Sequence, residues 1–207
     1  DEFLLWYFKR FAKFKDYKPN EVHKWLSNKD LITQNIDGLD GKAGNRNYIP
    51  IHGRLDKVTI FHNEGEIHEL IDAPWEEILK ACSNQSNDKQ LKLELLNAFK
   101  ISQKSLKPEI NISLKPFVLL FDEYYSDLYK IKKAKFLMEN AKKMIFIGTS
   151  FSVNITNIAL EIAKKNNCEI EIIDPNPIEI SFENITYHKI TASEYIQKKE
   201  KLDIKYN

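Results

Sequence analysis

From residue 117 to residue 190 the chain alternates short apolar runs with helix-like stretches, and this alternation restricts the fold more than any other feature. The predicted strands lie at 117–121, 144–147, 169–173 and 186–190, and the helices between them at 128–142 and 154–166. Strands that alternate with helices pair in parallel, because each helix carries the chain back across one face of the sheet. The sequence therefore predicts an α/β fold with a parallel sheet covered by helices on both faces.

The upstream half is predicted to add helices, short strands and an inserted lobe. A helix over residues 1–14 carries aromatic side chains on more than one face, so we expect it to be largely buried. A second helix begins near Pro19, and its His23 is expected to be a structural, hydrogen-bonded histidine. Short extended segments follow at 30–33, 48–51 and 56–63, and helices at 74–82 and 88–104.

These patterns predict two domains. Residues 1–55 and 115–207 would form the main domain, and residues 56–114 a small, mostly helical lobe inserted into it. A chain of this length can bury one sizeable core with a small appended lobe.

Composition narrows the class of protein. The 31 basic and 30 acidic residues nearly cancel, so the chain has no electrostatic footprint for nucleic acid. No apolar run approaches the roughly 20 residues of a membrane helix. The two cysteines, Cys82 and Cys168, are expected to be reduced in a cytoplasmic protein, with a single bridge as the alternative.

Polar side chains gather where predicted strands end. Gln34, Asn35 and Asp37 follow the 30–33 strand, and the next glycine is Gly38. A surface turn is the simple alternative for this loop, because Asn and Asp are ordinary turn residues. The same clustering recurs after the later strands, at Asp122–Glu123, at Gly148–Thr149–Ser150 and at Asp174–Asn176. Because ligands bind at the carboxyl ends of parallel strands, this recurrence favours a binding site for a polar ligand.

With these motifs in order, the chain resembles the sirtuins, the NAD-consuming protein deacylases. The matching segments are residues 33–39 (TQNIDGL), 43–44 (AG), 52–53 (HG), 148–150 (GTS) and 173–177 (IDPNP). The resemblance covers most of the chain from residue 3 to about residue 196. It implies a Rossmann-like main domain with NAD as co-substrate and an acylated protein or peptide as partner.

The resemblance implies roles for the first two motifs. Gln34 would hold the hydroxyls of the nicotinamide ribose, and Asn35 would position water or ribose near the scissile bond. Asp37 would bind the nicotinamide carboxamide. His52 would be the general base, because a neutral imidazole can accept a ribose hydroxyl proton near physiological pH.

It also implies roles for the later motifs. Gly148, Thr149 and Ser150 would meet the adenosine half of NAD at the head of the 154–166 helix, where backbone N–H groups stabilise a phosphate. Asp174, with Asn176 beside it, would face the adenosine ribose. Phe121, Asp122 and Glu123 would bind the substrate peptide as an added strand.

Several departures from the family pattern alter these expectations. The glycine-rich NAD loop of the family is absent, so we expect an N-terminal piece of tens of residues to be missing. Asp122 stands where the family has Gly, Asp40 where it has His, and Asp174 where it has Asn. The family's structural zinc is held by four cysteines in the small lobe, and a lone Cys82 cannot make that set. We therefore predict no metal site, and regard His62 and His68 with Cys82 as a weak alternative.

The leading expectation is an NAD-dependent protein-lysine deacylase that cleaves the nicotinamide–ribose bond. Asp122 and the missing cysteines make an NAD glycohydrolase or an ADP-ribosyltransferase the rival. A non-catalytic module that senses NAD or ADP-ribose is the alternative from another class, and the intact set of Gln34, Asn35, Asp37 and His52 argues against it. The acyl group, the target protein and the oligomeric state do not follow from the sequence.

Overall fold

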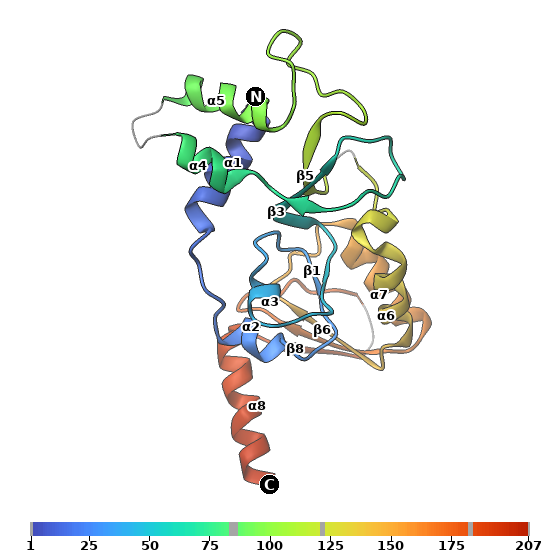
Figure 1. Ribbon diagram of the computed structural model, residues 1–207. Coiled ribbons are helices and arrows are strands. Elements are labelled where there is room, and N and C mark those ends of the chain that lie inside the picture. Colours follow the sequence, from blue (N-terminus) through green and yellow to red (C-terminus); the bar gives the residue numbers. More distant parts are fainter. Residues whose placement is uncertain (1, 83–86, 121–122, 182–183, 207) are drawn as a thin grey trace. The chain divides into compact units, whose positions relative to one another are not determined.

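The computed structural model describes residues 2–82, 87–120, 123–181 and 184–206, the last five of them by backbone alone. The predicted peptide-binding residues Phe121 and Asp122 therefore lie outside the described residues. The chain divides into two compact units (Figure 1). Unit one comprises residues 1–18 and 31–131, and unit two comprises residues 19–30 and 132–207.

Unit one contains two small sheets. β1 (Ile32–Thr33) pairs in parallel with β2 (Ile49–Pro50). β3 (Gly53–Ile60) is the centre of an antiparallel sheet, with β4 (Ile71–Asp72) on one side and β5 (Leu114–Val118) on the other. The helices are α1 (Glu2–Phe14), α3 (Leu39–Lys42), α4 (Trp75–Ala81) and α5 (Asp88–Ala98), with a 3-10 turn at Asp127–Tyr129.

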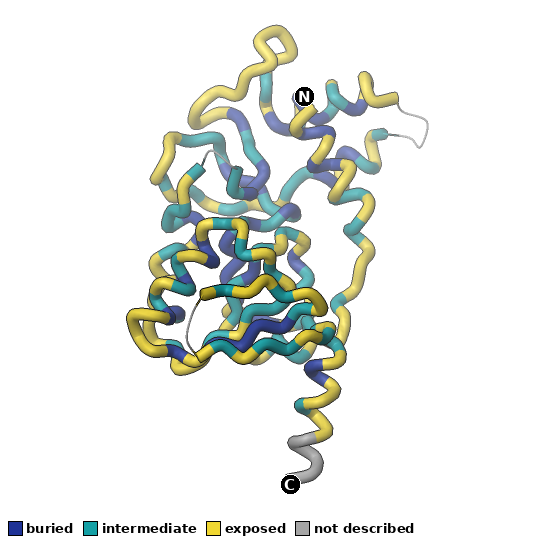
Figure 2. The backbone as a smooth tube through the Cα atoms, turned by 180° about the vertical axis from the view of Figure 1, so that it is seen from behind, coloured by how far each residue is buried: buried dark blue, intermediate teal, exposed yellow. Residues whose placement is uncertain are grey.

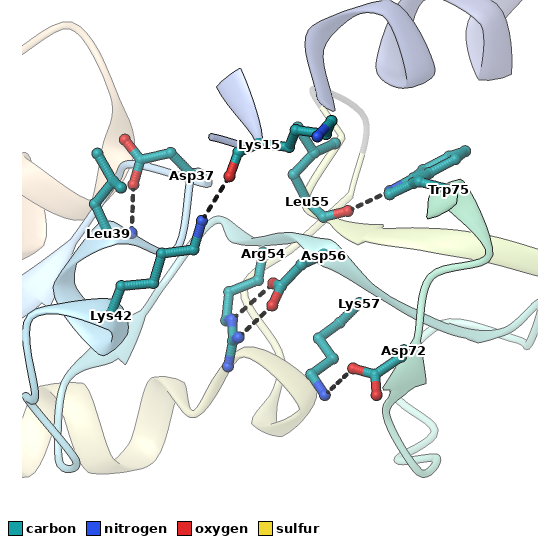
Figure 3. Close-up of polar contacts among 10 residues, drawn as sticks. All are labelled: Lys15, Asp37, Leu39, Lys42, Arg54, Leu55, Asp56, Lys57, Asp72 and Trp75. Atoms are coloured by element: carbon teal, nitrogen blue, oxygen red, sulfur yellow. Dashed lines mark hydrogen bonds and ion pairs between the residues drawn. The ribbon is translucent and has the colours of Figure 1, made fainter. Parts of the chain in front are cut away.

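The main core of unit one joins helices α1, α4 and α5 to strand β3. Trp75 is completely buried, and its indole Nε1–H donates to the carbonyl of Leu55 on β3 at 2.7 Å (Figure 3). Phe8 and Phe99 pack against the Trp75 ring, with ring centroids 6.1 Å and 5.0 Å away. Because this core holds α1, residues 1–14 and the predicted insertion share one hydrophobic interior.

The structure corrects two expectations for unit one. The apolar run that begins at Phe117 was predicted to form a parallel strand, but β5 pairs antiparallel with β3. α1 is not buried on all faces: Leu4, Leu5 and Phe8 point into the core, whereas Trp6 is 51% exposed. The guanidinium of Arg10 covers the exposed Trp6 ring from 4.2 Å.

Unit two contains the predicted parallel sheet. β6 (Lys143–Ile147), β7 (Glu169–Ile173) and β8 (Ile185–His188) pair in parallel in that order. The helices are α2 (Glu21–Leu26), α6 (Ile131–Asn140), α7 (Asn154–Lys165) and α8 (Ala192–Tyr206).

Alternate residues of β7 show that helices cover both faces of this sheet. Ile170 and Ile172 pack with Ala163 of α7, while Ile173 packs with Tyr195 of α8 and with Trp25 of α2. The prediction of a parallel sheet between two helical layers is therefore confirmed for unit two. His23 is also confirmed as structural, because it completes a capping box with Asn20 at the start of α2.

Figure 2 colours each residue by how far it is buried. The loop from residue 102 to residue 112 is exposed along its whole length. Cys82 and Cys168 are both free thiols. Among the described residues, no helix combines the length and the apolar character needed to cross a membrane.

Candidate functional site

The polar loop of unit one leaves the carboxyl end of β1. Two backbone bonds align the neighbouring strand: Ile49 N–H donates to the carbonyl of Leu31 at 2.8 Å, and Ile51 N–H donates to that of Thr33 at 3.0 Å. Parallel pairing brings the residues after both strands to the same edge. His52, which follows β2 by two positions, therefore lies beside the Gln34 segment.

His52 is partly buried and has two uncharged partners. Its ring hydrogen-bonds to the backbone of Gln34, and its Nε2 lies 2.9 Å from the hydroxyl of Tyr125. Burial lowers the pKa of His52 below its usual value, and the bond to the Gln34 backbone opposes this by raising it. The lowered pKa favours the neutral imidazole, and this is the form that a general base requires.

Gly53 fixes the position of His52 against strand β5. Its φ of +87° lies in the left-handed region, and a Cβ at this residue would stand 2.0 Å from the carbonyl oxygen of Phe117. On the other side, Leu119 N–H donates to the His52 carbonyl at 3.0 Å. Only glycine combines this backbone conformation with so close an approach. The His52–Gly53 pair is thus required by packing as well as by chemistry.

Asp37 and Asn35 lie in the same loop and are exposed. The Asp37 carboxylate accepts from the Leu39 N–H at 2.9 Å and so holds the start of α3 (Figure 3). Asn35 is fixed through its backbone, whose N–H donates to the Thr33 hydroxyl at 3.2 Å. Lys42, from the same helix, donates to the carbonyl of Lys15. The loop is therefore held by these contacts, and Asn35 is exposed.

Glu123 is held by groups of the protein. Its carboxylate pairs with the ammonium of Lys115, accepts from the Leu120 N–H at 3.2 Å and accepts from the Tyr129 hydroxyl at 3.3 Å. Burial and this carboxylate together raise the pKa of Tyr129 far above its usual value. The Glu123 side chain thus has partners within the protein, and its contact with a substrate peptide stays a prediction.

The two later motifs lie next to each other in unit two. Their strands, β6 and β7, end in register at Ile147 and Ile173, and Gly148 N–H donates to the Ile173 carbonyl at 3.0 Å. The Asp174 carboxylate accepts from the Asn176 N–H at 2.8 Å. Apart from Gly148 itself and its two chain neighbours, no described atom lies within 4 Å of where a Gly148 Cβ would stand. A side chain at Gly148 would therefore meet open space.

The same edge continues into the start of α7. The hydroxyls of Ser150 and Ser152 lie 2.7 Å apart, and Phe151 N–H donates to the Thr149 hydroxyl at 3.4 Å. Ser150 is exposed. The segment after β6 thus presents hydroxyls and backbone groups ahead of a 12-residue helix.

Tyr125 is the site residue that sequence reasoning missed. Its ring stacks on His52 with centroids 5.9 Å apart and an interplanar angle of 17°. It stands 73 positions along the chain from His52, and no local pattern links the two. The one available signal was its place just after the predicted peptide-binding segment.

Comparison with known proteins agrees with this geometry. The Sir2 family model matches residues 2–155. The NAD-dependent deacetylase sir2E of Dictyostelium discoideum is 32% identical over 162 residues, which are 70% of this chain and 43% of that protein. An NAD-dependent protein deacylase of Bacteroides thetaiotaomicron is 25% identical, over 85% of this chain and 67% of that protein. The chain therefore spans less than half of the first relative and about two thirds of the second.

Solved structures show the same fold. A Sir2 homologue in complex with NAD superposes with a TM-score of 0.67 at 22% identity, covering 94% of this chain and 68% of that one. A Sir2 complex with a p53 peptide and NAD gives a TM-score of 0.65 at 22% identity, covering 92% and 74%. The α/β fold is thus shared with these structures. From the family match over residues 2–155, together with the His52–Gly53 geometry, we conclude that the chain belongs to the Sir2 family.

Proposed function

We propose that this chain belongs to an enzyme that consumes NAD to remove acyl groups from protein lysines. The relatives that match most of the chain are named as NAD-dependent protein deacylases and deacetylases. The observation that carries the proposal is the state of His52: it is partly buried, contacts the backbone of Gln34, and has a lowered pKa. Such a residue is neutral at physiological pH and can act as a base.

The residues of unit one would handle the reacting end of the co-substrate. NAD supplies the ribose and the nicotinamide leaving group. His52 would accept a proton from a ribose hydroxyl at Nε2, after the Tyr125 hydroxyl has left that atom. Gln34 would orient the ribose hydroxyls, Asn35 would position ribose or water, and Asp37 would bind the carboxamide.

The residues of unit two would hold the adenosine half. The open space at Gly148 fits a backbone that a phosphate approaches closely, and Thr149 and Ser150 add hydroxyl donors. Asp174 and Asn176 offer acceptors for ribose hydroxyls.

The free thiols of Cys82 and Cys168 support a cytoplasmic location. We also propose that residues 1–55 and 115–207 form the NAD-binding domain and that residues 56–114 form a lobe inserted into it.

The test is the coupling between two products. The full-length protein is incubated with NAD, with and without an acetyl-lysine peptide, and nicotinamide and deacetylated peptide are measured together. Deacylation predicts one nicotinamide per deacetylated lysine and little release without peptide. The His52→Ala variant, purified in parallel, controls for contaminating activity.

Two results would contradict the proposal. Nicotinamide released at the same rate without peptide would identify a glycohydrolase, or a transferase if ADP-ribose appears on protein. Saturable NAD binding with no nicotinamide release would identify a sensing module.

A further inference from the structure

A cluster of two histidines and one glutamate lies in the loop between β3 and β4, outside the residues assigned to NAD. One ligand-type atom from each of His62, Glu66 and His68 lies within 4.8 Å of the other two. The rings of His62 and His68 have centroids 5.0 Å apart and are tilted by 33°. The three residues span seven positions, so the loop alone brings them together.

An ion pair explains only part of this arrangement. His68 Nε2 lies 2.9 Å from one Glu66 carboxylate oxygen, which is an ordinary contact for such a pair. It leaves His62 without an explanation, because the Nε2 of His62 is buried and has no hydrogen-bond partner among the described residues. Buried polar atoms are normally paired, and an exception calls for a bound group or a special role.

The tautomer of His62 is the one that a metal ligand needs. Its Nδ1 lies 2.7 Å from the carbonyl oxygen of Asn63. A carbonyl only accepts, so the ring proton is on Nδ1 and the lone pair is on the buried Nε2. Histidines that bind metals commonly donate their other ring N–H to a backbone carbonyl in this way.

Glu66 is likewise oriented by a hydrogen bond from a neighbouring residue that is not itself a proposed ligand. The Asn63 side-chain amide donates to its other carboxylate oxygen at 3.2 Å. The Asn63 carbonyl also accepts from the Glu66 backbone N–H at 3.3 Å. Asn63 therefore contacts both His62 and Glu66, and one ligand-type atom of each lies within 4.8 Å of the other and of one on His68.

We propose that His62, Glu66 and His68 form a site for one divalent transition metal ion, with zinc as the first candidate. Two imidazoles and one carboxylate are a known ligand set for zinc, and water would complete a tetrahedral site. The same set also suits other first-row ions such as Co²⁺. The bound ion would cross-link the loop between residues 62 and 68 in a lobe whose one cysteine is Cys82. This site does not depend on the proposed function.

The test measures Zn²⁺ binding to the full chain. Titration calorimetry of the metal-free protein should give one equivalent of Zn²⁺ per chain. Substitution with Co²⁺ should give the visible absorption of a tetrahedral ion with nitrogen and oxygen ligands. Added Zn²⁺ should raise the unfolding temperature of the wild-type protein, because a ligand that binds only the folded state stabilises it.

Variants separate this site from other zinc-binding groups. His62→Gln and Glu66→Gln should each weaken Zn²⁺ binding at least about tenfold and remove the stabilisation by Zn²⁺. Glu69→Gln removes the same charge from the same loop and should bind like wild type. Cys82→Ser should also bind like wild type, because the thiol is not a ligand. If one variant does not fold, the other still tests the site.

Three results would overturn the proposal. The first is no stoichiometric Zn²⁺ binding by the wild-type protein, in which case Glu66 and His68 are only an ion pair. The second is unchanged affinity in both His62→Gln and Glu66→Gln. The third is loss of binding in Cys82→Ser.

Discussion

Two histidines of this protein each lie beside a tyrosine, and their surroundings differ in charge. In unit one, His52 contacts the Tyr125 hydroxyl and the backbone of Gln34, both uncharged. In unit two, His188 Nε2 lies 3.0 Å from a carboxylate oxygen of Glu171, with the Tyr195 ring against it at 4.9 Å. His188 thus contacts a charged carboxylate, whereas the two partners named for His52 are uncharged.

Glu171 is the centre of the second arrangement. It is 7% exposed, pairs with Lys143, and accepts from the Tyr195 hydroxyl at 2.5 Å. Burial alone would raise the pKa of Glu171, but the hydrogen bonds from Lys143 and Tyr195 and the Lys143 charge outweigh it and lower the pKa to about 2. The buried charge of Glu171 links β7 to α8 through the Tyr195 hydroxyl. Burial of His52 instead favours its neutral form.

The largest expected effect is the loss of kcat/KM when His52 is replaced. His52→Ala should lower kcat/KM for NAD-dependent deacylation by about 10²- to 10⁴-fold, the usual contribution of a general base. In the wild type, burial lowers the pKa of His52, so kcat/KM should fall on acidification with a midpoint below about 6.5. His188→Gln, which removes a histidine beside a carboxylate, should change stability and leave that midpoint in place. Equal losses of kcat/KM in His52→Ala and His188→Gln would contradict the assignment of a catalytic role to His52 and a structural role to His188.

The next effect is on stability through Glu171. Glu171→Gln should reduce the free energy of unfolding by about 1–2 kcal/mol at pH 7, because it removes the charge that Tyr195 and Lys143 contact, while the partly exposed Lys143 ammonium stays hydrated. The pKa of Glu171 is lowered to about 2 in the folded state. Its contribution is therefore complete above the unfolded value of about 4.5 and is lost as pH falls from there toward 2. Denaturant unfolding at pH 7 and at pH 3 checks this.

The two pH values give that experiment its control. The difference in stability between wild type and Glu171→Gln should shrink at pH 3, where the wild-type carboxylate has lost part of its contribution. A difference that stays constant between pH 7 and pH 3 would mean that the carboxylate charge is not what stabilises unit two.

The smallest effect is a shift of the His52 titration. Tyr125→Phe removes the hydroxyl that lies 2.9 Å from Nε2 and that, as a donor, stabilises the neutral ring. Loss of a hydrogen bond of about 1 kcal/mol should raise the pKa of His52 by at most about 0.7 unit. The acidic limb of kcat/KM should move to higher pH by that amount. Tyr124→Phe is the matched control, because Tyr124 is 77% exposed; a limb that stays in place in Tyr125→Phe would show that the hydroxyl does not act on the base.

Much of the fold could be predicted because its signals are local. Helices α4 and α7 and strands β6 and β7 lie within one or two residues of their predicted ranges, since apolar periodicity and caps act over a few positions. The direction of β5 could not be predicted in this way. An apolar run beginning at Phe117 fits a buried strand of either direction, and its partner β3 lies more than 50 positions away.

The residues of the candidate site also differ in whether a local sequence pattern reveals them. The His52–Gly53 dipeptide could be found in the sequence, and the structure adds the close approach of Gly53 to Phe117. Tyr125 and Glu66 could not be found. Tyr125 meets His52 only through the fold, and Glu66 joins His62 and His68 through a loop conformation that residue spacing does not specify.

The position of Trp75 in unit one and Trp25 in unit two has a practical consequence. Trp75 is completely buried in unit one, and Trp25 packs with the Tyr195 cluster of unit two. Indole emission depends on exposure to water, so each unit carries its own intrinsic fluorophore. Because Trp6 also lies in unit one, Trp6→Phe combined with Trp25→Phe would leave Trp75 as the reporter of unit one, and Trp6→Phe combined with Trp75→Phe would leave Trp25 as the reporter of unit two. Melting curves recorded at the emission maximum of each variant would reveal whether both halves lose their structure together.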